Sequence, residues 1–320
     1  MSEFISKKWL VIINPSSGNG KVKKKWKKIV KKELDVMNVN YTEYFTTGPE
    51  DAITKIGLEI DNFDGFVSVG GDGTANEVLN GILLSTVEQG KPNDKLLVII
   101  PGGTGNDLAT AMGMPNKNLE ESCNVFKTGK LRKVDAGRAS GINFSGESVT
   151  RFFCGVLSTG FDAEVAIKTN SGAKWLPGTF NYVKSLLTTL IKMKTRGYAF
   201  KVDSEEHTEN GILLAVGLGP YYGGGMMICP NAKVDDGKFD VVFLKKVSRR
   251  TLLRVFPKVY DGKHLTHPAV TEYETESINI SNTIDTYWQV DGEVIGFTPV
   301  SITTAKESLN ILAPEQEKIL

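Results

Sequence analysis

The sequence has few of the features that would assign it at once to a secreted, metal-binding or hydrolytic class. Its three cysteines, Cys123, Cys154 and Cys229, lie far apart without CxxC or Cys/His spacing, so neither disulfides nor structural zinc are expected. The three histidines show no HExxH pattern and predict surface or turn positions. No serine stands in a GxSxG elbow, so serine-hydrolase chemistry has no support.

A charge excess and an unbroken hydrophobic run are also lacking. The 38 lysines and arginines are balanced by 37 acidic residues, so no long-range field favours nucleic acid, and no such partner is expected. The uncharged stretch 212–229 is broken by Pro220 and several glycines, which predicts a strand and a glycine-rich loop instead of a membrane span. The N-terminal apolar run is too short for a signal peptide, and we expect a cytoplasmic protein.

What the sequence does contain is a regular alternation of short apolar strands and helical patterns in its first part. Strands are expected at 9–13, 41–46, 63–69 and 96–100, and helices at 20–37, 50–60, 74–85 and 105–113. Such an alternation is typical of βαβ units. It predicts a parallel sheet covered by helices on both faces.

From about residue 131 the pattern changes to closely spaced β-type segments. They cover residues 131–137, 149–158, 198–204, 211–217, 238–245, 271–281 and 286–304, with helical patterns at 178–195 and 248–261. A second, mainly antiparallel domain is therefore expected after a boundary near residue 137. A cleft between two domains is a usual place for a ligand site.

Three of the expected strands end in glycine-bearing turns, at residues 14–20, 70–73 and 101–107. In open α/β sheets, ligands bind at the carboxyl ends of the strands, where these turns gather. Asp72 lies in its turn at a helix N-terminus, which suits a phosphate group and its magnesium ion. Val22 stands where a Walker A loop needs serine or threonine, and no turn reads GxGxxG. The phosphate site therefore differs from those of P-loop and Rossmann proteins.

The segment Lys21–Lys32 carries eight lysines around an apolar stripe formed by Val22, Trp26, Ile29 and Val30. One interpretation is a basic amphipathic face that meets an anionic membrane. The other is a solvated outer helix whose apolar stripe packs on the sheet. We favour the second for the stripe, while the lysine face would add a weak attraction to anionic lipid. Lys21, at the mouth of the first turn, is the lysine expected nearest to phosphate.

Acidic residues recur at the expected cleft. They are Asp72, Asp107, Asp135, Asp291 and Glu293. Phosphoryl transfer needs magnesium between the phosphates, donors for their oxygens and a carboxylate for the proton of the attacking hydroxyl. The acidic residues supply candidates for these roles. Asp107 and Asp291 are interpreted equally well as capping and turn residues.

With these residues in view, the chain resembles the bacterial diacylglycerol kinase-like lipid kinases, whose catalytic domain is related to that of sphingosine kinases. The resemblance rests on six blocks in the family's order: NPSSGNGK at 14–21, GGDGTANEVLNG at 70–81, PGGTGNDLA at 101–109, VDAG at 134–137, PNAKVDDGKFDV at 230–241 and VDGE at 290–293. The GGDGT sequence alone is shared with NAD kinases and phosphofructokinases. The later blocks make the likeness specific.

The resemblance implies an N-terminal α/β domain of the three-layer NAD kinase and diacylglycerol kinase type, followed by a C-terminal, mainly antiparallel β-sandwich domain. The last strand would return to the first domain. The nucleotide-binding domain would then comprise residues 1–136 plus 305–320, and the lipid-substrate domain residues 137–304.

The resemblance also implies the residues of the site. The nucleotide would be bound at Asn14, Pro15, Ser16, Ser17, Gly18, Thr46, Gly71, Asp72, Gly73, Thr74, Ala75, Asn76, Glu77 and Thr104. Glu293 or the Asp72/Asp135 pair would accept the proton of the lipid hydroxyl, and Asp72, Asp107 and Asp135 would form an acidic network that holds the catalytic magnesium through water. A second, structural magnesium would be bound by the Asp236 carboxylate and by the backbone carbonyls of Lys233 and Lys238, because an ammonium group cannot ligate a cation.

We therefore predict a magnesium-dependent lipid kinase of phospholipid metabolism that transfers the γ-phosphoryl group of ATP to a lipid hydroxyl, with diacylglycerol as the expected substrate and phosphatidic acid as the product. It would act as a peripheral protein at the inner face of the membrane. Whether it forms a homodimer is left open by the sequence. The acyl chains are expected to contact the second domain at the 178–195 helix and the 220–227 loop. Two alternatives stay open: a kinase of NAD or a sugar phosphate, and a non-catalytic nucleotide or lipid sensor.

Overall fold

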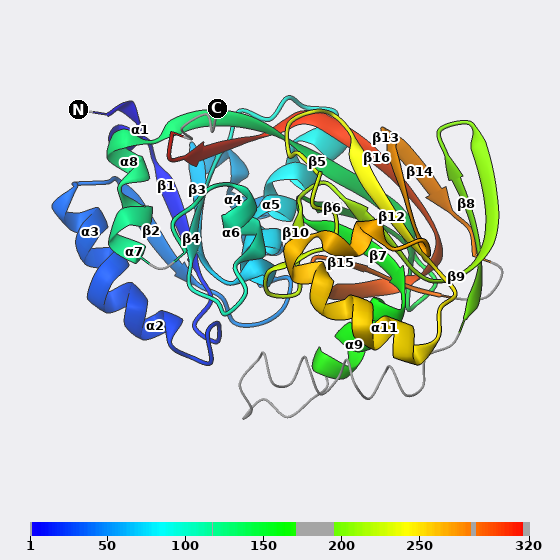
Figure 1. Ribbon diagram of the computed structural model, residues 1–320. Helices are drawn as coiled ribbons and strands as arrows, with labels where there is room; N and C mark the ends of the chain where they lie inside the picture. Colours follow the sequence, from blue (N-terminus) through cyan, green and yellow to red (C-terminus); the bar gives the residue numbers. More distant parts are fainter. Residues whose placement is uncertain (1, 117, 171–194, 283–285, 316–320) are drawn as a thin grey trace. The chain divides into compact units, whose positions relative to one another are not determined.

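The computed structural model describes residues 2–116, 118–170, 195–282 and 286–315 of the chain (Figure 1). Contacts divide the chain into two compact units: unit 1 is Met1–Ala136 with Lys306–Leu320, and unit 2 is Gly137–Ala305. Unit 2 is thus inserted into the sequence of unit 1. The chain leaves unit 1 within strand β5 (Lys130–Asn143) and returns to it within strand β16 (Glu293–Ala313).

Unit 1 is built on a parallel sheet, to which β16 contributes its last part. The remaining strands of this sheet are β1 (Trp9–Ile13), β2 (Tyr41–Phe45), β3 (Gly65–Gly70) and β4 (Leu96–Pro101), and the strand order is β16-β4-β3-β1-β2. Every pair is parallel, including the pairing of Asn310 in β16 with Leu96 in β4. All residues of β1, β3 and β4 are buried, as expected for apolar strands covered on both faces. The predicted parallel sheet is confirmed.

Helices lie on both faces of this sheet (Figure 1). One group contains α4 (Asp51–Glu59) and α5 (Asp72–Ser85), and the other contains α2 (Val22–Lys25), α3 (Lys31–Val36) and α7 (Leu119–Cys123). Between α2 and α3 the helix continues as a π-helical segment, η1 (Trp26–Val30). The shorter helices are α1 (Glu3–Ser6), η2 (Ile60–Asn62), η3 (Val87–Gln89), α6 (Asp107–Ala111) and α8 (Val125–Thr128).

The lysine-rich segment runs through α2, η1 and the start of α3. Val22, Trp26 and Val30 are fully buried, and the indole N–H of Trp26 donates to Glu43 Oε2 at 2.8 Å. Most of the lysines between them are exposed. The apolar stripe therefore belongs to the core and the basic face is solvated, which confirms the second interpretation of this segment.

Unit 2 is an antiparallel β-sandwich. In addition to β5 and β16 it contains β6 (Ser148–Phe153), β7 (Val156–Gly160), β8 (Arg196–Val202), β9 (Glu205–Gly217), β12 (Phe239–Lys245), β13 (Val270–Thr275), β14 (Ser277–Ile280) and β15 (Tyr287–Val290). The antiparallel pairings β9-β8-β14-β16-β15-β7-β9 form a closed circuit, and β12 and β13 extend it from β9. Closure gives most of these strands a partner on both sides.

Helical segments of unit 2 include α9 (Phe161–Asn170), α11 (Arg249–Val255), η4 (Phe256–Asp261) and η5 (Lys263–Thr266). α11 begins after Ser248, whose Oγ accepts the backbone N–H of Thr251 at 3.1 Å, and η4 follows it directly and ends at Gly262, where φ is +69°. This segment confirms the helix predicted at 248–261. The helix predicted at 178–195 lies outside the described residues.

Across the residues that the structure describes, no helix is both long enough and apolar enough to cross a bilayer. The uncharged stretch 212–229 forms the end of β9 and a glycine-rich hairpin, as the sequence predicts. The hairpin strands are β10 (Tyr221–Tyr222) and β11 (Met226–Met227). The three cysteines are buried and free, in agreement with the expectation of no disulfides.

Candidate active site

Three glycine-rich loops follow β1, β3 and β4 and meet at the carboxyl ends of these strands. We call residues 14–20 loop 1, residues 70–73 loop 2 and residues 101–107 loop 3. The backbone N–H groups of Gly102 and Gly103 donate to the carbonyl oxygen of Gly70 at 2.6 and 3.0 Å. A Cβ atom on Gly103 would meet the Cα atom of Gly71 at 2.5 Å. Loops 2 and 3 therefore lie too close for a side chain at this contact.

Loop 1 is joined to the first turn of α5 by side-chain contacts. Asn14 Nδ2 donates to Thr74 Oγ1 at 3.1 Å, and Ser17 Oγ lies 3.3 Å from the same Thr74 oxygen. Gly18 has φ +59°, and a Cβ atom there would meet the carbonyl oxygen of Gly102 in loop 3 at 2.6 Å. The structure thus brings Asn14, Ser17, Gly18 and Thr74, four of the predicted nucleotide-binding residues, into one cluster.

The N-terminus of α5 points into this cluster. Gly71 is the N-cap residue and makes no side-chain cap, so the N–H groups of the 14-residue helix's first turn are available to an anion together with the positive end of the helix dipole. Asn76 is buried one turn further on, where its Oδ1 accepts from Asn80 Nδ2 at 3.0 Å. The backbone at 71–74 is therefore a better candidate for phosphate contact than the Asn76 side chain, whereas the Ala75 N–H donates to the carbonyl oxygen of Gly71 at 3.1 Å.

Asp72 fastens loop 3 to the start of α5. Its Oδ2 accepts the backbone N–H of Asn106 at 2.7 Å, and its Oδ1 accepts that of Leu108 at 3.0 Å. Burial raises the pKa of this carboxyl group above its ordinary value, and the backbone donors of Leu108 and Asn106 oppose that rise. Asp72 thus has a structural role in addition to its charge, because its carboxylate accepts backbone N–H groups at the start of α6.

The other predicted residues of unit 1 lie in different surroundings. Asp107 is half-buried at the first position of α6, and Thr104 is exposed in loop 3. Glu77 faces α4, where its Oε2 accepts the backbone N–H of Ala52 at 3.3 Å. Thr46 is buried after β2, and its N–H donates to the carbonyl oxygen of Ile13 at 2.9 Å.

Asp135 is a buried link between β5 and the part of β16 that belongs to unit 1. Its side chain is 2 % exposed, and its Oδ1 accepts the backbone N–H of Glu307 at 2.7 Å. Glu307 has φ +48°, so the acceptor fixes β16 where its backbone departs from extended geometry. Like Asp72, Asp135 therefore has a clear structural role in addition to any catalytic one.

In unit 2, Glu293 is exposed at the first position of β16, just after a tight turn. Asp291 in that turn has φ +48°, and its Oδ1 accepts the backbone N–H of Val156 at 2.9 Å. Gly292 has φ +89°, and its N–H donates to Gln289 Oε1 at 2.6 Å. The turn is held by these bonds, which makes Asp291 a turn residue and gives Glu293 a fixed backbone position.

The predicted structural cation site is the turn that leads into β12. Asp236 Oδ1 accepts the backbone N–H of Lys238 at 3.1 Å, and the Lys238 ammonium forms an ion pair with Glu274. Lys233, at the start of the turn, is exposed.

Negative charge accumulates beside this turn. Burial, followed by the nearby carboxylates of Asp236, Glu274 and Glu272, raises the pKa of Asp240 to about 6. Oxygen donors and excess negative charge suit a hard divalent cation. Within the described ranges, no three His, Cys, Asp or Glu side chains are grouped to hold a metal, so the backbone carbonyls would have to complete the shell.

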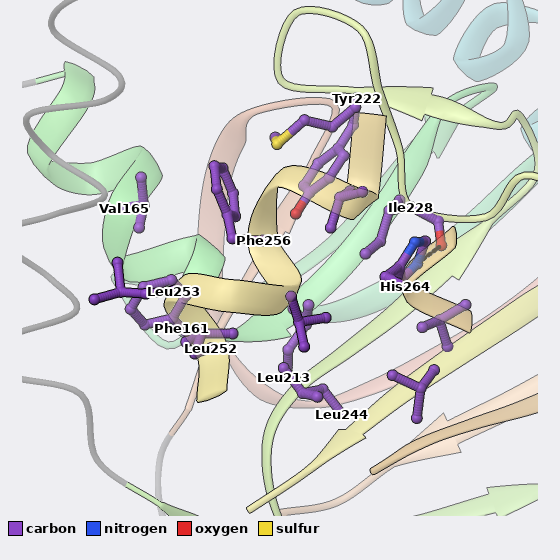
Figure 2. Close-up of a pocket in the computed structure, with 15 residues that line it drawn as sticks. Phe161, Val165, Leu213, Tyr222, Ile228, Leu244, Leu252, Leu253, Phe256 and His264 are labelled. Atoms are coloured by element: carbon purple, nitrogen blue, oxygen red, sulfur yellow. Dashed lines mark hydrogen bonds between the residues drawn. The ribbon is translucent and has the colours of Figure 1, made fainter. Parts of the chain in front are cut away.

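An apolar cavity of about 70 Å³, partly open to solvent, lies within unit 2 (Figure 2). Phe161 comes from α9, Leu213 and Leu244 from β9 and β12, and Phe256 from η4, and Tyr222 lies at the hairpin. An almost entirely apolar lining suits hydrocarbon better than a nucleotide or a sugar.

The sequence reasoning missed two parts of this cavity. His264 was expected at a surface or turn position; it lies in the short segment η5 and not at the surface, since it is 3 % exposed and its Nε2 lies 3.1 Å from the carbonyl oxygen of Ile228. Phe161 and Val165 carried no signal because the α9 sequence, FDAEVAIKTN, does not separate an apolar face from a polar one. The apolar spacing of 252–259 was the signal that could have indicated this wall.

The parallel sheet, its three glycine-rich loops and the inserted sandwich define the class of the NAD kinase and diacylglycerol kinase fold. Residues 8–139 match the diacylglycerol kinase catalytic domain family. Residues 155–313 match the family described as the YegS C-terminal NAD kinase beta sandwich-like domain. Both parts of the chain thus match domains of diacylglycerol kinase-like proteins, with the second part inserted into the first.

Relatives named as diacylglycerol kinases match almost the whole chain. One from Staphylococcus saprophyticus is 29% identical over 309 residues, covering 96% of this chain and 96% of the relative. A candidate diacylglycerol kinase of Bacillus anthracis has a solved structure with a TM-score of 0.77, 25% identity and 98% of each chain covered. A yeast NADH kinase solved with NADH shares the fold at a TM-score of 0.51 and 11% identity, covering 97% of this chain and 84% of that chain.

Proposed function

We propose that this protein transfers the γ-phosphoryl group of ATP to the hydroxyl group of a membrane lipid, with diacylglycerol as the substrate and phosphatidic acid as the product. The observation that carries the lipid part is the apolar cavity of unit 2. A kinase of NAD or of a sugar phosphate has no use for an apolar cavity, because polar groups buried there would lose hydrogen bonds to water. The names of the relatives support the same choice.

The nucleotide would be bound by the three loops of unit 1. The N–H groups at the start of α5, from Gly71 to Thr74, would face the phosphate oxygens, and Asn14, Ser17 and Thr74 would add side-chain donors. Pro15, Ser16, Gly18 and Gly73 belong to the same loops, whereas Thr46 and Glu77 would act by supporting them.

In the proposed reaction, the lipid hydroxyl oxygen forms a bond to the γ-phosphorus, the bond to the β,γ-bridging oxygen breaks, and ADP leaves. The hydroxyl proton passes to a carboxylate, for which Glu293 is the first candidate because it is exposed on a fixed backbone position. Asp72, Asp107 and Asp135 would hold the charge of the site. Magnesium, when bound, would offset the charge of the phosphates.

Removal of the candidate structural cation gives a test that needs no substrate. We expect Mg²⁺ to raise the melting temperature of the protein by a few degrees, since about 1 kcal/mol of binding linkage shifts it by roughly 2–4 °C. Asp236→Ala should abolish this rise. Asp261→Ala, which removes another exposed carboxylate of unit 2, is the matched control and should keep it. An unchanged Mg²⁺ response in Asp236→Ala would exclude this turn as the site.

Filling the cavity should affect the lipid and not the nucleotide. Leu244 is half-buried in the cavity wall, so Leu244→Trp should raise KM for a long-chain diacylglycerol by about tenfold or more while KM for ATP stays constant. Leu58→Trp, on the exposed face of α4, is the control. Equal KM values in the Leu244 variant and the wild type would place the acyl chains elsewhere.

The assignment itself is tested with γ-labelled ATP and Mg²⁺ over three acceptors: diacylglycerol in mixed micelles, NAD and fructose 6-phosphate. Label in phosphatidic acid alone supports the proposal. Label in NAD or in the sugar indicates a kinase of a soluble substrate. ATP binding without transfer across a wider lipid panel would indicate a non-catalytic sensor.

A further inference from the structure

The α11–η4 segment presents an unusual surface at the cavity. Between Lys246 and Lys263 the sequence has six cationic residues and one acidic residue, whereas the whole chain has a net charge of only +1. The cationic residues are Lys246, Arg249, Arg250, Arg254, Lys258 and Lys263, and all are exposed. Positive charge is therefore concentrated on one short helical stretch.

Most of this charge is not neutralised by the protein. The single carboxylate of the segment, Asp261, lies 3.1 Å from the ammonium group of Lys263. Among the described residues, Arg249, Arg250 and Arg254 form no ion pair. Exposed guanidinium groups without partners are well suited to an external anion.

Large apolar side chains are exposed among these cations. Leu253 is 49% exposed and Tyr260 is 42% exposed, and both belong to the short set of large exposed hydrophobic side chains in the described chain. Leu253 also lines the cavity, beside Leu252 and Phe256 (Figure 2). Leu253 therefore lies at the rim of the cavity.

The segment divides its residues between two surroundings. Val255 and Val259 are buried, and they line the cavity with Phe256. Arg250 and Arg254, one helical turn apart, face solvent. Cations around exposed apolar side chains on a helix are the pattern of a segment that lies in the interface of an anionic bilayer.

We propose that the α11–η4 segment docks on the surface of an anionic phospholipid bilayer, with Leu253 and Tyr260 inserted among the acyl chains and Arg249, Arg250 and Arg254 at the lipid phosphates. Docking would bring the cavity mouth to the source of its ligand. The proposal rests on the proposed lipid substrate for its purpose, and on charge and exposure for its geometry. It assigns membrane contact to this segment instead of the lysine-rich face of α2 and η1.

Vesicle sedimentation of the full chain without ATP tests the docking by itself. The protein should bind vesicles of phosphatidylcholine with about a third of phosphatidylglycerol, and hardly bind phosphatidylcholine alone, with binding that weakens as salt rises. Arg250→Gln with Arg254→Gln should reduce the affinity by about 20-fold to 30-fold, because each charge near an anionic surface contributes roughly a factor of five. Leu253→Asp should reduce it as well.

Matched controls lie on unit 1. Lys27→Gln with Lys28→Gln removes two exposed cations of the lysine-rich face, and Leu58→Asp changes an equally apolar side chain that is 76% exposed. Both should bind as the wild type does. Loss of binding in the lysine pair with retention in the arginine pair would overturn the proposal, as would equal binding to neutral vesicles or an arginine-dependent dimer in solution.

The docking and the kinase function can fail separately. The arginine pair should phosphorylate a short-chain diacylglycerol dispersed in detergent at the wild-type rate and lose turnover on vesicles. If the wild type phosphorylates no lipid at all, the proposed function fails, while the vesicle result still decides the docking.

Discussion

Asp72→Asn is expected to reduce phosphoryl transfer by about 1,000-fold or more, the scale at which removal of one preorganised electrostatic group acts. The carboxylate lies in the first turn of α5, among the loops that would hold the phosphates. Its loss removes a buried negative charge whose pKa is already raised by burial. Initial rates with labelled ATP and a confirmed lipid measure the effect, and near-normal rates would contradict the assignment.

The same substitution should also cost stability, which the sequence alone did not indicate. Asp72 accepts the backbone N–H groups of Asn106 and Leu108, and an asparagine amide can accept with only one of its two polar atoms. We expect about 1–3 kcal/mol of lost unfolding free energy, measured by urea denaturation.

Asp51→Asn separates the two effects. Asp51 Oδ2 accepts the backbone N–H of Thr47 at 2.6 Å and its Oδ1 accepts from the Tyr44 hydroxyl at 2.9 Å, so this carboxylate at the first position of α4 also ties a preceding segment to a helix. Its variant should lose similar stability and keep its turnover. Loss of turnover in both variants would show that loosened loops, and not the Asp72 charge, are responsible.

Gly103→Ala is expected to weaken ATP binding by about 100-fold, although it adds only one methyl group. The new Cβ would meet the Cα of Gly71 at 2.5 Å and Asn106 Oδ1 at 3.0 Å. The Gly71 Cα belongs to the backbone and cannot turn away as the Asn106 side chain can, so loops 2 and 3 must separate, and displacements of about 1 Å in such sites cost about this factor. Overpacking should also cost about 1–3 kcal/mol of stability.

Gly57→Ala is the matched control for this change. Gly57 lies inside α4, where an added Cβ would have Ser85 Oγ as its only near neighbour, at 3.6 Å. Alanine there should stabilise the helix by about 0.5–1 kcal/mol and leave ATP binding unchanged. Calorimetric ATP titration of both variants checks the pair, and full-strength binding by Gly103→Ala would contradict the close approach of the loops.

Local patterns were sufficient to predict the sheet of unit 1 and its loops. The runs at β1, β3 and β4 are apolar because both faces of a parallel sheet are covered, and this composition is visible without the fold. The turns after them require glycine because a Cβ atom would collide with a neighbouring loop, as at Gly18 and Gly103. Such requirements are met within a few residues of the chain.

The parts that escaped prediction depend on residues far apart in the sequence. The cavity combines α9, β9, β12 and η4, which span Phe161 to Val270, and no local pattern indicates their meeting. The burial of His264 follows from its contact with Ile228, 36 positions away. Similarly, Asp72 looks like a purely catalytic residue until its bonds to loop 3 are known. The burial and bonding of such residues depend on packing between distant parts of the chain, which local secondary-structure propensity does not indicate.

The return of β16 to unit 1 has a consequence for any attempt to dissect the protein. A fragment that ends at Ala136 would lack Asn310 and Ile311, the partners of β4, and also the Glu307 backbone that Asp135 holds. Its β4 would become an open, fully apolar edge, which is prone to aggregation. A soluble nucleotide-binding fragment therefore has to be made as an internal deletion, in which a short linker joins residue 136 to the segment that begins at Lys306.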